Sequence, residues 1–408
     1  MENEEERRVQ GAGRPRVLVV AGRAGKLQVA KDAGFEVVYV QAPQVFTQAH
    51  RDGLDEALLL DYTRPERVIP VVAGLHSVAP LDLIVSFTDP GLDLAATLSE
   101  QFGLPGNRAA VSAVLRDKHA LRRRLAEAGI EHHPCARVRT AADLRAFGDA
   151  QGYPLILKPL DGTGSQGVRR IDSPQDADRA FAAETVTDVP LLAERFLTGT
   201  EISVETISQH GRHRVIALTR KFIDENFVEK GHVVPAGVGT EDRAAVELLV
   251  RGLLDAVGLT EGCAHTEVML TPDGPVIIES HNRMGGDRIY ELVKLSHGTD
   301  LERLSYLLPL DREVLPASSP RPQCAAAIWF VRAEPGRVVA VDGEDAATGL
   351  PGVCEVVVTA APGDTVAPVR SSSDRVGYVI ATGADSDEAL GRARRAATAI
   401  VVRTEAAQ

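Results

Sequence analysis

The most constraining feature of the sequence is a turn, Thr271-Pro-Asp-Gly274, between two strand-like segments. Proline and glycine at these positions favour a tight turn, so we expect the segments to form an antiparallel hairpin. Glu267 and Glu279 lie at nearly equal distances from the centre of the turn, and they should therefore face each other. Because side chains alternate between the two faces of a strand, His265 and His281 should share that face.

The paired glutamates indicate a cation site. Two carboxylates about 4 Å apart repel by roughly 4 kcal/mol at an effective dielectric of 20. Paired oxygen ligands suit Mg²⁺, which is usually held by one or two carboxylates and by substrate phosphates. Zinc is the alternative that the two histidines suggest, and a solvated outer face is the alternative without a metal. We expect the opposite face of the hairpin to be filled by Val268, Leu270, Val276 and Ile278.

A glycine-rich loop follows the strand-like segment that ends near Lys158. Residues 168–171 after the loop read as another strand, whereas a dinucleotide-binding motif needs a helix there, and no GxxxxGK[ST] motif is present. Glycine backbone N–H groups can still approach a phosphate, and Lys158 could neutralise it. The alternative is an ordinary flexible hairpin with a surface lysine. The loop residues that would surround a phosphate are Gly162, Gly164, Ser165 and Gly167.

The order of the elements predicts an α/β protein of several parts. Strand-like and helical segments alternate over the first 110 residues, which indicates a small α/β layer. Asp117 is a good N-cap for a helix that Gly129 should end. Residues 244–257 have the apolar spacing of a helix. Beyond a linker rich in proline and serine at 315–322, we expect a separate C-terminal unit with a final helix near 387–402.

Composition excludes several classes of protein. The chain of 408 residues has 45 Lys and Arg against 57 Asp and Glu, a net charge of −12, so it lacks the positive field that non-specific nucleic-acid binding requires. No run approaches the length of a membrane-spanning helix, and the acidic first residues do not resemble a signal peptide. The 4 cysteines show no CxxC spacing. We therefore expect a cytoplasmic protein that binds neither nucleic acid nor membranes.

Taken together, the motifs resemble the ATP-grasp superfamily of carboxylate–amine ligases over roughly residues 105–302. The resemblance rests on the segment 104–118, the glycine loop, the segment 194–205 and the glutamate hairpin, in that order. It implies an α/β (α+β) ATP-grasp fold with a Rossmann-like N-terminal domain and a small C-terminal α+β extension. The implied boundaries are 14–112, 113–190 with the glycine loop, 191–312 with the metal and substrate site, and 323–408.

The resemblance also implies how ATP would bind. Lys118, Lys158 and the glycine loop would contact the phosphates. Phe196 and Leu197 would bind the adenine edge beside Glu194, and Glu201 would hold the ribose. Two Mg²⁺ ions, which Mn²⁺ could replace, would be carried by Glu267 and Glu279. Many members have an asparagine where this chain has His281, so ligation of the metal by His281 is in doubt.

A further segment, 227–236, is similar to the substrate-facing strand of bacterial L-amino-acid ligases, which make dipeptides. By that resemblance Glu229, His232 and Gly286 would contact the substrates, and Arg283 would steady the acyl phosphate. We therefore expect an ADP-forming ligase of amino acids or amines, acting as a homodimer on small molecules. The alternatives are an ATP-grasp enzyme that uses formate or bicarbonate, and an inactive nucleotide-binding protein.

Overall fold

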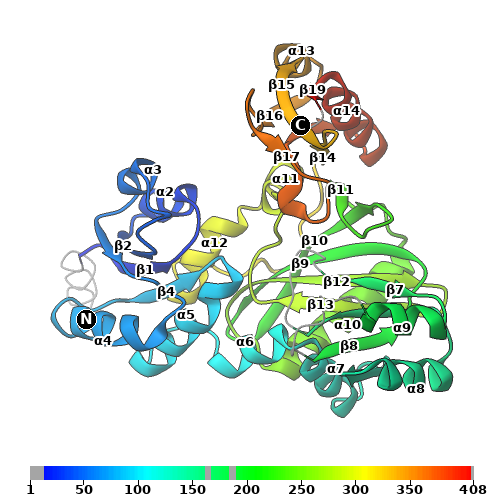
Figure 1. The fold of residues 1–408 in the computed structure, drawn as a ribbon. Helices are drawn as coiled ribbons and strands as arrows, with labels where there is room; N and C mark the ends of the chain where they lie inside the picture. Colours follow the sequence, from blue (N-terminus) through cyan, green and yellow to red (C-terminus); the bar gives the residue numbers. More distant parts are fainter. Residues whose placement is uncertain (1–12, 161–166, 183–189, 406–408) are drawn as a thin grey trace.

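The computed structural model describes residues 13–160, 167–182 and 190–405. Four sheets organise this part of the chain (Figure 1). The first is parallel, in the order β3-β2-β1-β4, and comprises β1 (Arg16–Val20), β2 (Glu36–Gln41), β3 (Glu56–Leu59) and β4 (Leu83–Ser86). Its helices are α2 (Ala24–Asp32), α3 (Gln48–Asp52), α4 (Pro65–Val78) and α5 (Asp89–Phe102).

A second, antiparallel sheet has the order β5-β8-β6-β7. Its strands are β5 (Cys135–Val138), β6 (Leu155–Pro159), β7 (Arg169–Ile171) and β8 (Leu191–Arg195). Leu144 of α8 (Ala141–Gln151) and Ala177 of α9 (Pro174–Ala182) pack against its apolar residues. The strand expected after the glycine loop is therefore present as β7. Lys158 is the last residue but one of β6.

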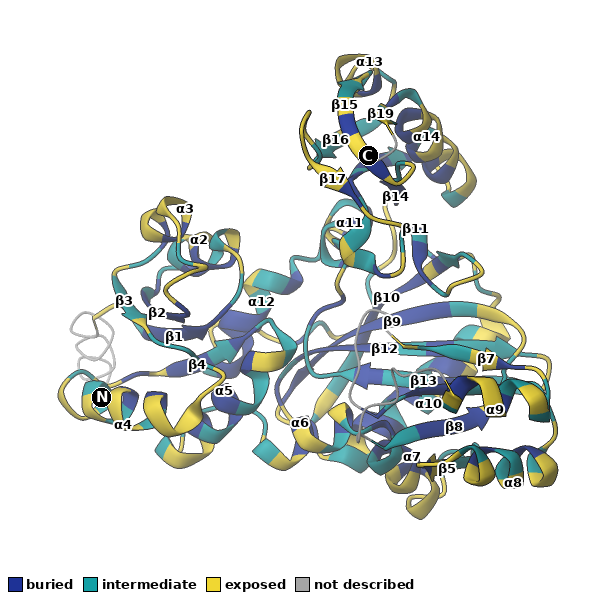
Figure 2. Ribbon diagram, in the orientation of Figure 1, coloured by how far each residue is buried: buried dark blue, intermediate teal, exposed yellow. Residues whose placement is uncertain are grey.

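The third sheet is the largest, with 8 strands in the order β13-β12-β9-β10-β11-β14-β18-β16. Its strands are β9 (Thr200–Gln209), β10 (Arg212–Ile223), β11 (Glu229–Val234), β12 (Gly262–Thr271), β13 (Gly274–His281), β14 (Ala325–Val331), β16 (Val353–Val358) and β18 (Gly377–Gly383). Its central strands are buried (Figure 2). On one side lie α10 (Thr240–Val257), α6 (Ala109–Arg116) and α7 (Lys118–Glu127), which share an apolar core with it.

A second core lies against the same sheet and contains side chains of α11 (Ile289–His297), α12 (Leu301–Leu307) and η1 (Leu308–Leu310). The helix predicted from Asp117 is confirmed as α7, since the Asp117 carboxylate accepts hydrogen bonds from the backbone N–H groups of His119 and Ala120. The helix predicted at 244–257 is confirmed as α10, but it begins at Thr240. Within the described residues, no helix has the length and apolar character needed to cross a bilayer.

The C-terminal part, which we expect to be a separate unit, adds strands to the large sheet. β14 pairs with β11, and β18 pairs with both β14 and β16. The small sheet β17-β15-β19 completes this part, with β15 (Gly336–Asp342), β17 (Thr365–Val366) and β19 (Val401–Glu405). The remaining elements are α13 (Glu344–Thr348), η2 (Ser372–Asp374) and α14 (Ser386–Ala399).

Candidate active site

The β12–β13 hairpin carries the residues that were expected to face each other. Glu267 pairs with Glu279, and His265 pairs with His281, so the predicted register is confirmed. A β-bulge after Glu267 then shifts the register, and Val268 pairs with Ile277. Ile277 is therefore buried in the core beside α10. Ile278 lines a pocket on the glutamate side instead, so the expectation that it fills the opposite face was wrong.

That pocket, called here the first pocket, lies between the second sheet and the hairpin. It brings together eight of the residues expected to contact nucleotide or metal: Lys118, Lys158, Glu194, Phe196, Leu197, Glu201, Glu267 and Glu279. In the glycine loop, Gly162, Gly164 and Ser165 lie outside the described residues. Gly167 is described and has a φ of 74°, which favours glycine, and a Cβ there would lie 3.1 Å from Cγ of Pro159.

A buried ion-pair network supports one wall of the first pocket. The Glu194 carboxylate lies 2.6 Å from Nε of Arg122 and 2.6 Å from Nζ of Lys158. Burial alone would raise the pKa of Glu194, but these two cations lower it well below its usual range. Arg122 also donates to Glu131 at 2.8 Å. Sequence reasoning missed Arg122, although an arginine next to the apolar stripe of α7 is a signal that could have found it.

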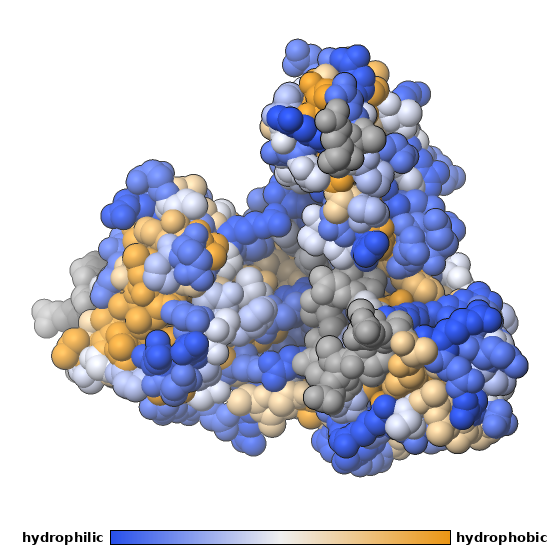
Figure 3. Space-filling view, viewed as in Figure 1, coloured by the Kyte–Doolittle hydropathy of each residue, from blue (hydrophilic) through white to orange (hydrophobic). Residues whose placement is uncertain are grey.

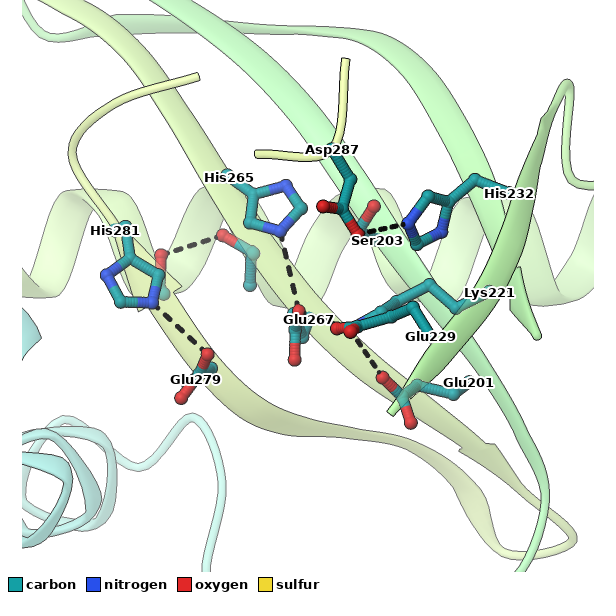
Figure 4. Close-up of polar contacts among 12 residues, drawn as sticks. Glu201, Ser203, Lys221, Glu229, His232, His265, Glu267, Glu279, His281 and Asp287 are labelled. Atoms are coloured by element: carbon teal, nitrogen blue, oxygen red, sulfur yellow. Dashed lines mark hydrogen bonds and ion pairs between the residues drawn. The ribbon is translucent and has the colours of Figure 1, made fainter. Parts of the chain in front are cut away.

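A single lysine is shared by three glutamates on the opposite wall (Figure 4). Nζ of Lys221, on β10, lies 2.7 Å from Glu201 and 3.6 Å from Glu229, and it is also hydrogen-bonded to Glu267. The Lys221 side chain is 4% exposed. Burial lowers its pKa, but the surrounding carboxylates raise it well above the usual value, so the lysine is charged. Sequence reasoning missed Lys221, whose only signal is its place in a largely apolar strand.

Each glutamate of the hairpin has cationic partners and is ionised. Burial would raise the pKa of Glu267, but Lys221 and His265 hold it at about 2. Lys118 Nζ lies 3.0 Å from Oε2 of Glu279. Together with His281 it lowers the pKa of Glu279 well below the usual range, despite burial.

Asp89, the first residue of α5, joins the N-terminal domain to the site. Arg283 donates to both carboxylate oxygens of Asp89, from Nε and Nη2, at 2.7 Å each. His281 lies between two carboxylates, 3.3 Å from Asp89 and 3.2 Å from Glu279. Burial lowers the pKa of His281, but these carboxylates raise it overall, which favours the imidazolium. Ligation of a metal by His281 stays a prediction.

A second pocket opens beside the first. It contains all four residues expected to contact substrate: Glu229, His232, Arg283 and Gly286. The two pockets have Lys221, Glu267 and Glu279 in common. A Cβ on the neighbouring Gly285 would lie 2.8 Å from Nδ1 of His265, so a larger residue at 285 would force one of the two to shift.

The second pocket also contains groups that sequence reasoning did not single out. His232 Nε2 lies 3.0 Å from Oδ2 of Asp287 (Figure 4). Arg375 donates to the same oxygen. Ser372 donates to Oε2 of Glu229 at 2.7 Å. Ser372 and Arg375 come from the C-terminal part of the chain, and only the tertiary fold places them here.

The two glutamates of the hairpin are oxygen donors of the kind that Mg²⁺ prefers. Glu267 and Glu279 are opposed, ionised oxygen donors that line both pockets. Among the described residues, no group of three or more His, Cys, Asp or Glu side chains forms a complete metal site. An ion between these glutamates would therefore need further oxygen ligands, and substrate phosphates can supply them.

The second pocket joins three parts of the chain: the hairpin of the large sheet, Asp89 from the N-terminal domain, and Ser372 from the C-terminal part. The space-filling view shows a notch in the molecular surface between the N-terminal domain and the C-terminal part (Figure 3).

Comparisons with known proteins agree with this architecture. Three family models match the chain: an ATP-grasp N-terminal domain over 27–106, an ATP-grasp domain over 151–291, and the L-amino acid ligase C-terminal domain 2 over 328–405. The solved L-amino acid ligase from Bacillus licheniformis superimposes with a TM-score of 0.84 at 22% identity, covering 97% of this chain and 100% of that one.

Relatives of similar sequence include the protein y4rH of Sinorhizobium fredii, 27% identical over 332 residues. The alanine–anticapsin ligase of Bacillus subtilis is 28% identical over 270 residues. These alignments cover 80% and 60% of this chain. The chain spans 69% of the first relative and 57% of the second.

The fold and the family models together define a member of the ATP-grasp ligases, and the predicted fold class is confirmed. This chain belongs to the ATP-grasp superfamily, and in its C-terminal part it has the domain of the L-amino acid ligases.

Proposed function

We propose that this protein is an ATP-dependent ligase that joins the carboxylate of an amino acid to an amine, releasing ADP and phosphate. The observation that carries the proposal is the junction of the two pockets at Lys221, Glu267 and Glu279. ATP in the first pocket would point its γ-phosphate at this junction, and a carboxylate in the second pocket would meet it there.

The chemistry proceeds in two steps. A carboxylate oxygen attacks the γ-phosphorus, the bond to the β-γ bridging oxygen breaks, and ADP leaves. The amine nitrogen then attacks the carbonyl carbon of the acyl phosphate, inorganic phosphate leaves, and the nitrogen loses a proton. Both steps move negative charge onto oxygen, so the protein stabilises them mainly by supplying cations at fixed positions.

The residues of the first pocket suit the binding of ATP. Lys118 and Lys158 are buried cations that can bind phosphate oxygens, and the loop from Gly162 to Gly167 would cover them. Phe196 and Leu197 would present backbone groups to the adenine, and Glu201 would bind the ribose. The Glu194 carboxylate is ion-paired with Arg122 and Lys158. Glu194 would therefore help to shape the site beside the adenine without binding the base through a free carboxylate.

Glu267 and Glu279 would hold two Mg²⁺ ions, which Mn²⁺ could replace. Bound metal supplies Lewis-acid stabilisation of the phosphoryl oxygens. In the second pocket Arg283, oriented by Asp89, would donate to the acyl phosphate, while Glu229, His232 and Gly286 would contact the amino acids. A homodimer remains a prediction.

Phosphate release with each of the twenty amino acids, singly and in pairs, tests the proposal. We expect ATP cleavage that depends on a particular amino acid or pair, and a product lighter by one water than the two substrates together. A carboxylated or formylated product would favour the formate- or bicarbonate-using alternative. Absence of ATP cleavage with every substrate would favour an inactive nucleotide-binding protein.

A further inference from the structure

The loop around η2 reaches from the C-terminal part into the second pocket. Ser372 lines this pocket, and its hydroxyl donates to Oε2 of Glu229 at 2.7 Å. The other carboxylate oxygen of Glu229 lies 3.6 Å from Nζ of Lys221. The orientation of Glu229 is therefore fixed by one residue of β10 and one residue that follows it by 151 positions in the chain.

Arg375 makes a second contact from the same loop. Its Nε donates to the Ser372 carbonyl oxygen at 2.7 Å, and its Nη1 donates to Oδ2 of Asp287 at 2.9 Å. Nη2 donates to the other oxygen of Asp287. The guanidinium lies over the Phe330 ring, 3.5 Å from the centroid, and the side chain is 9% exposed. Such a two-pronged ion pair fixes the carboxylate in one orientation.

Asp287 contacts both Arg375 and His232, so it links the two side chains. Its Oδ2 also lies 3.0 Å from Nε2 of His232, whose side chain is 1% exposed. Asp287 and the next residue, Arg288, both have left-handed backbone angles, with φ of 52° and 63°. Such angles are uncommon for residues other than glycine, so Arg375 holds Asp287 in a turn that needs support from its surroundings.

The loop is anchored to the rest of the protein. Next to it, Val376 N–H donates to the Val331 carbonyl oxygen at 3.1 Å, and β14 pairs with β11, which carries Glu229 and His232. Arg332, just beyond β14, donates to Asp224 at 2.6 Å and to the Glu229 carbonyl oxygen at 3.3 Å. The loop is therefore tied through β14 to β11, the strand that carries Glu229 and His232.

We propose that Ser372 and Arg375 are positioning residues of the amino-acid site. Ser372 fixes Glu229, and Arg375 fixes Asp287 and, through it, His232, so that the C-terminal part sets the affinity and selectivity for the amino acid. The proposal rests on the proposed function, which assigns Glu229 and His232 to amino-acid binding. Neither Ser372 nor Arg375 lines the first pocket, so the binding of ATP should not depend on them.

Steady-state kinetics of the full chain separate this role from a structural one. We expect Ser372→Ala and Arg375→Met to raise KM for the amino acid about tenfold or more, the effect of losing roughly 1.4 kcal/mol of binding. KM for ATP should stay within about twofold of the wild-type value. Ser372→Thr should restore most of the amino-acid affinity, whereas Arg375→Lys should restore only part, because an ammonium cannot bridge two oxygens.

Exposed residues of the same segment supply matched controls: Ser373→Ala and Arg370→Met should leave both KM values unchanged. A Ser372→Ala or Arg375→Met variant with wild-type KM for the amino acid would overturn the proposal, as would an equal rise in both KM values.

If no amino acid supports ATP cleavage by the wild type, the proposed function fails. Hydrogen exchange then decides the positioning role. The positioning role predicts that amide hydrogen exchange at 285–290 and 229–234 is faster in Arg375→Met than in Arg370→Met. Unchanged exchange in these two segments would refute the positioning role as well.

Discussion

Lys118 Nζ lies 3.0 Å from Oε2 of Glu279, so a lysine proposed to bind phosphate is paired with a carboxylate proposed to bind Mg²⁺. Lys221 is likewise ion-paired with Glu267. These pairs keep both glutamates ionised in a buried site. With ATP and Mg²⁺ bound, we expect Lys118 to turn to a phosphate oxygen while the metal replaces it at Glu279.

Glu279→Gln tests this exchange of partners. The substitution keeps the shape of the side chain but removes its charge, so we expect turnover to fall by about two orders of magnitude or more, as when a group that acts in the transition state is lost. The variant should still fold, although Lys118 and His281 lose a charged partner. The control is Glu127→Gln, at an exposed position of α7. Turnover near the wild-type value in Glu279→Gln would remove the metal-binding role from this hairpin.

Lys221→Met should destabilise the protein strongly. The substitution leaves Glu201, Glu229 and Glu267 without their shared cation, and loss of one partner from a buried pair costs about 3–5 kcal/mol. Without the lysine we expect burial to raise the pKa of Glu201 and Glu267 in the folded state. The loss in free energy of unfolding relative to the wild type should therefore shrink as the pH is lowered and these carboxylates become protonated. Urea unfolding at pH 7.5 and pH 5 measures this, and a deficit that grows at pH 5 would contradict the ion-pair account.

Gly285 and Gly286 form a natural matched pair. A Cβ at Gly285 would lie 2.8 Å from Nδ1 of His265, whereas nothing lies within 4 Å of a Cβ at Gly286. We expect Gly285→Ala to lower the free energy of unfolding by about 1–3 kcal/mol through overpacking. Gly286→Ala should stay within about 0.5 kcal/mol but should raise KM for the amino acid, because it lines the second pocket. Equal destabilisation by both changes would contradict the close approach at Gly285.

The buried pair of His265 and Glu205 predicts a pH dependence of stability. Nδ1 of His265 lies 2.9 Å from Glu205 Oε1, and although burial lowers the pKa of His265, the carboxylates raise it to about 9. The unfolded value is near 6.5, so the stabilisation is fully present below pH 6.5 and is lost as the pH rises through 9. The difference in melting temperature between the wild type and His265→Gln should accordingly shrink from pH 6.5 to pH 9.5. A difference that grows over this range would contradict the raised pKa.

The sequence predicted the parts of the site that local geometry determines. The turn at Thr271–Gly274 sets the register of its own hairpin, and the pairing of Glu267 with Glu279 follows from it. The bulge that turns Ile278 towards the pocket could not be predicted. The residues around it fit the alternation of side chains between the two faces of a strand in either register. The family resemblance placed the remaining expected residues, and the described ones line the two pockets, with Gly167 as the exception.

Contacts between distant segments were missed. Asp89 meets Arg283 from a position 194 residues away, and Arg375 meets Asp287 across 88 residues. The pairing of β11 with β14 joins the C-terminal part to the large sheet, although a proline-rich segment between them reads as a linker. Strand partners separated by such long loops leave no pattern in either strand alone, so only the fold reveals them.

The most direct test of the central claim follows the oxygen atoms of the activated carboxylate. The amino acid that supplies the carboxylate is labelled with ¹⁸O in both carboxylate oxygens and is incubated with the enzyme, ATP, Mg²⁺ and the amine. Mass spectrometry then measures the label in the products. Activation through an acyl phosphate predicts one ¹⁸O in the released inorganic phosphate and unlabelled ADP. Label in AMP, or unlabelled phosphate beside a ligated product, would contradict the account.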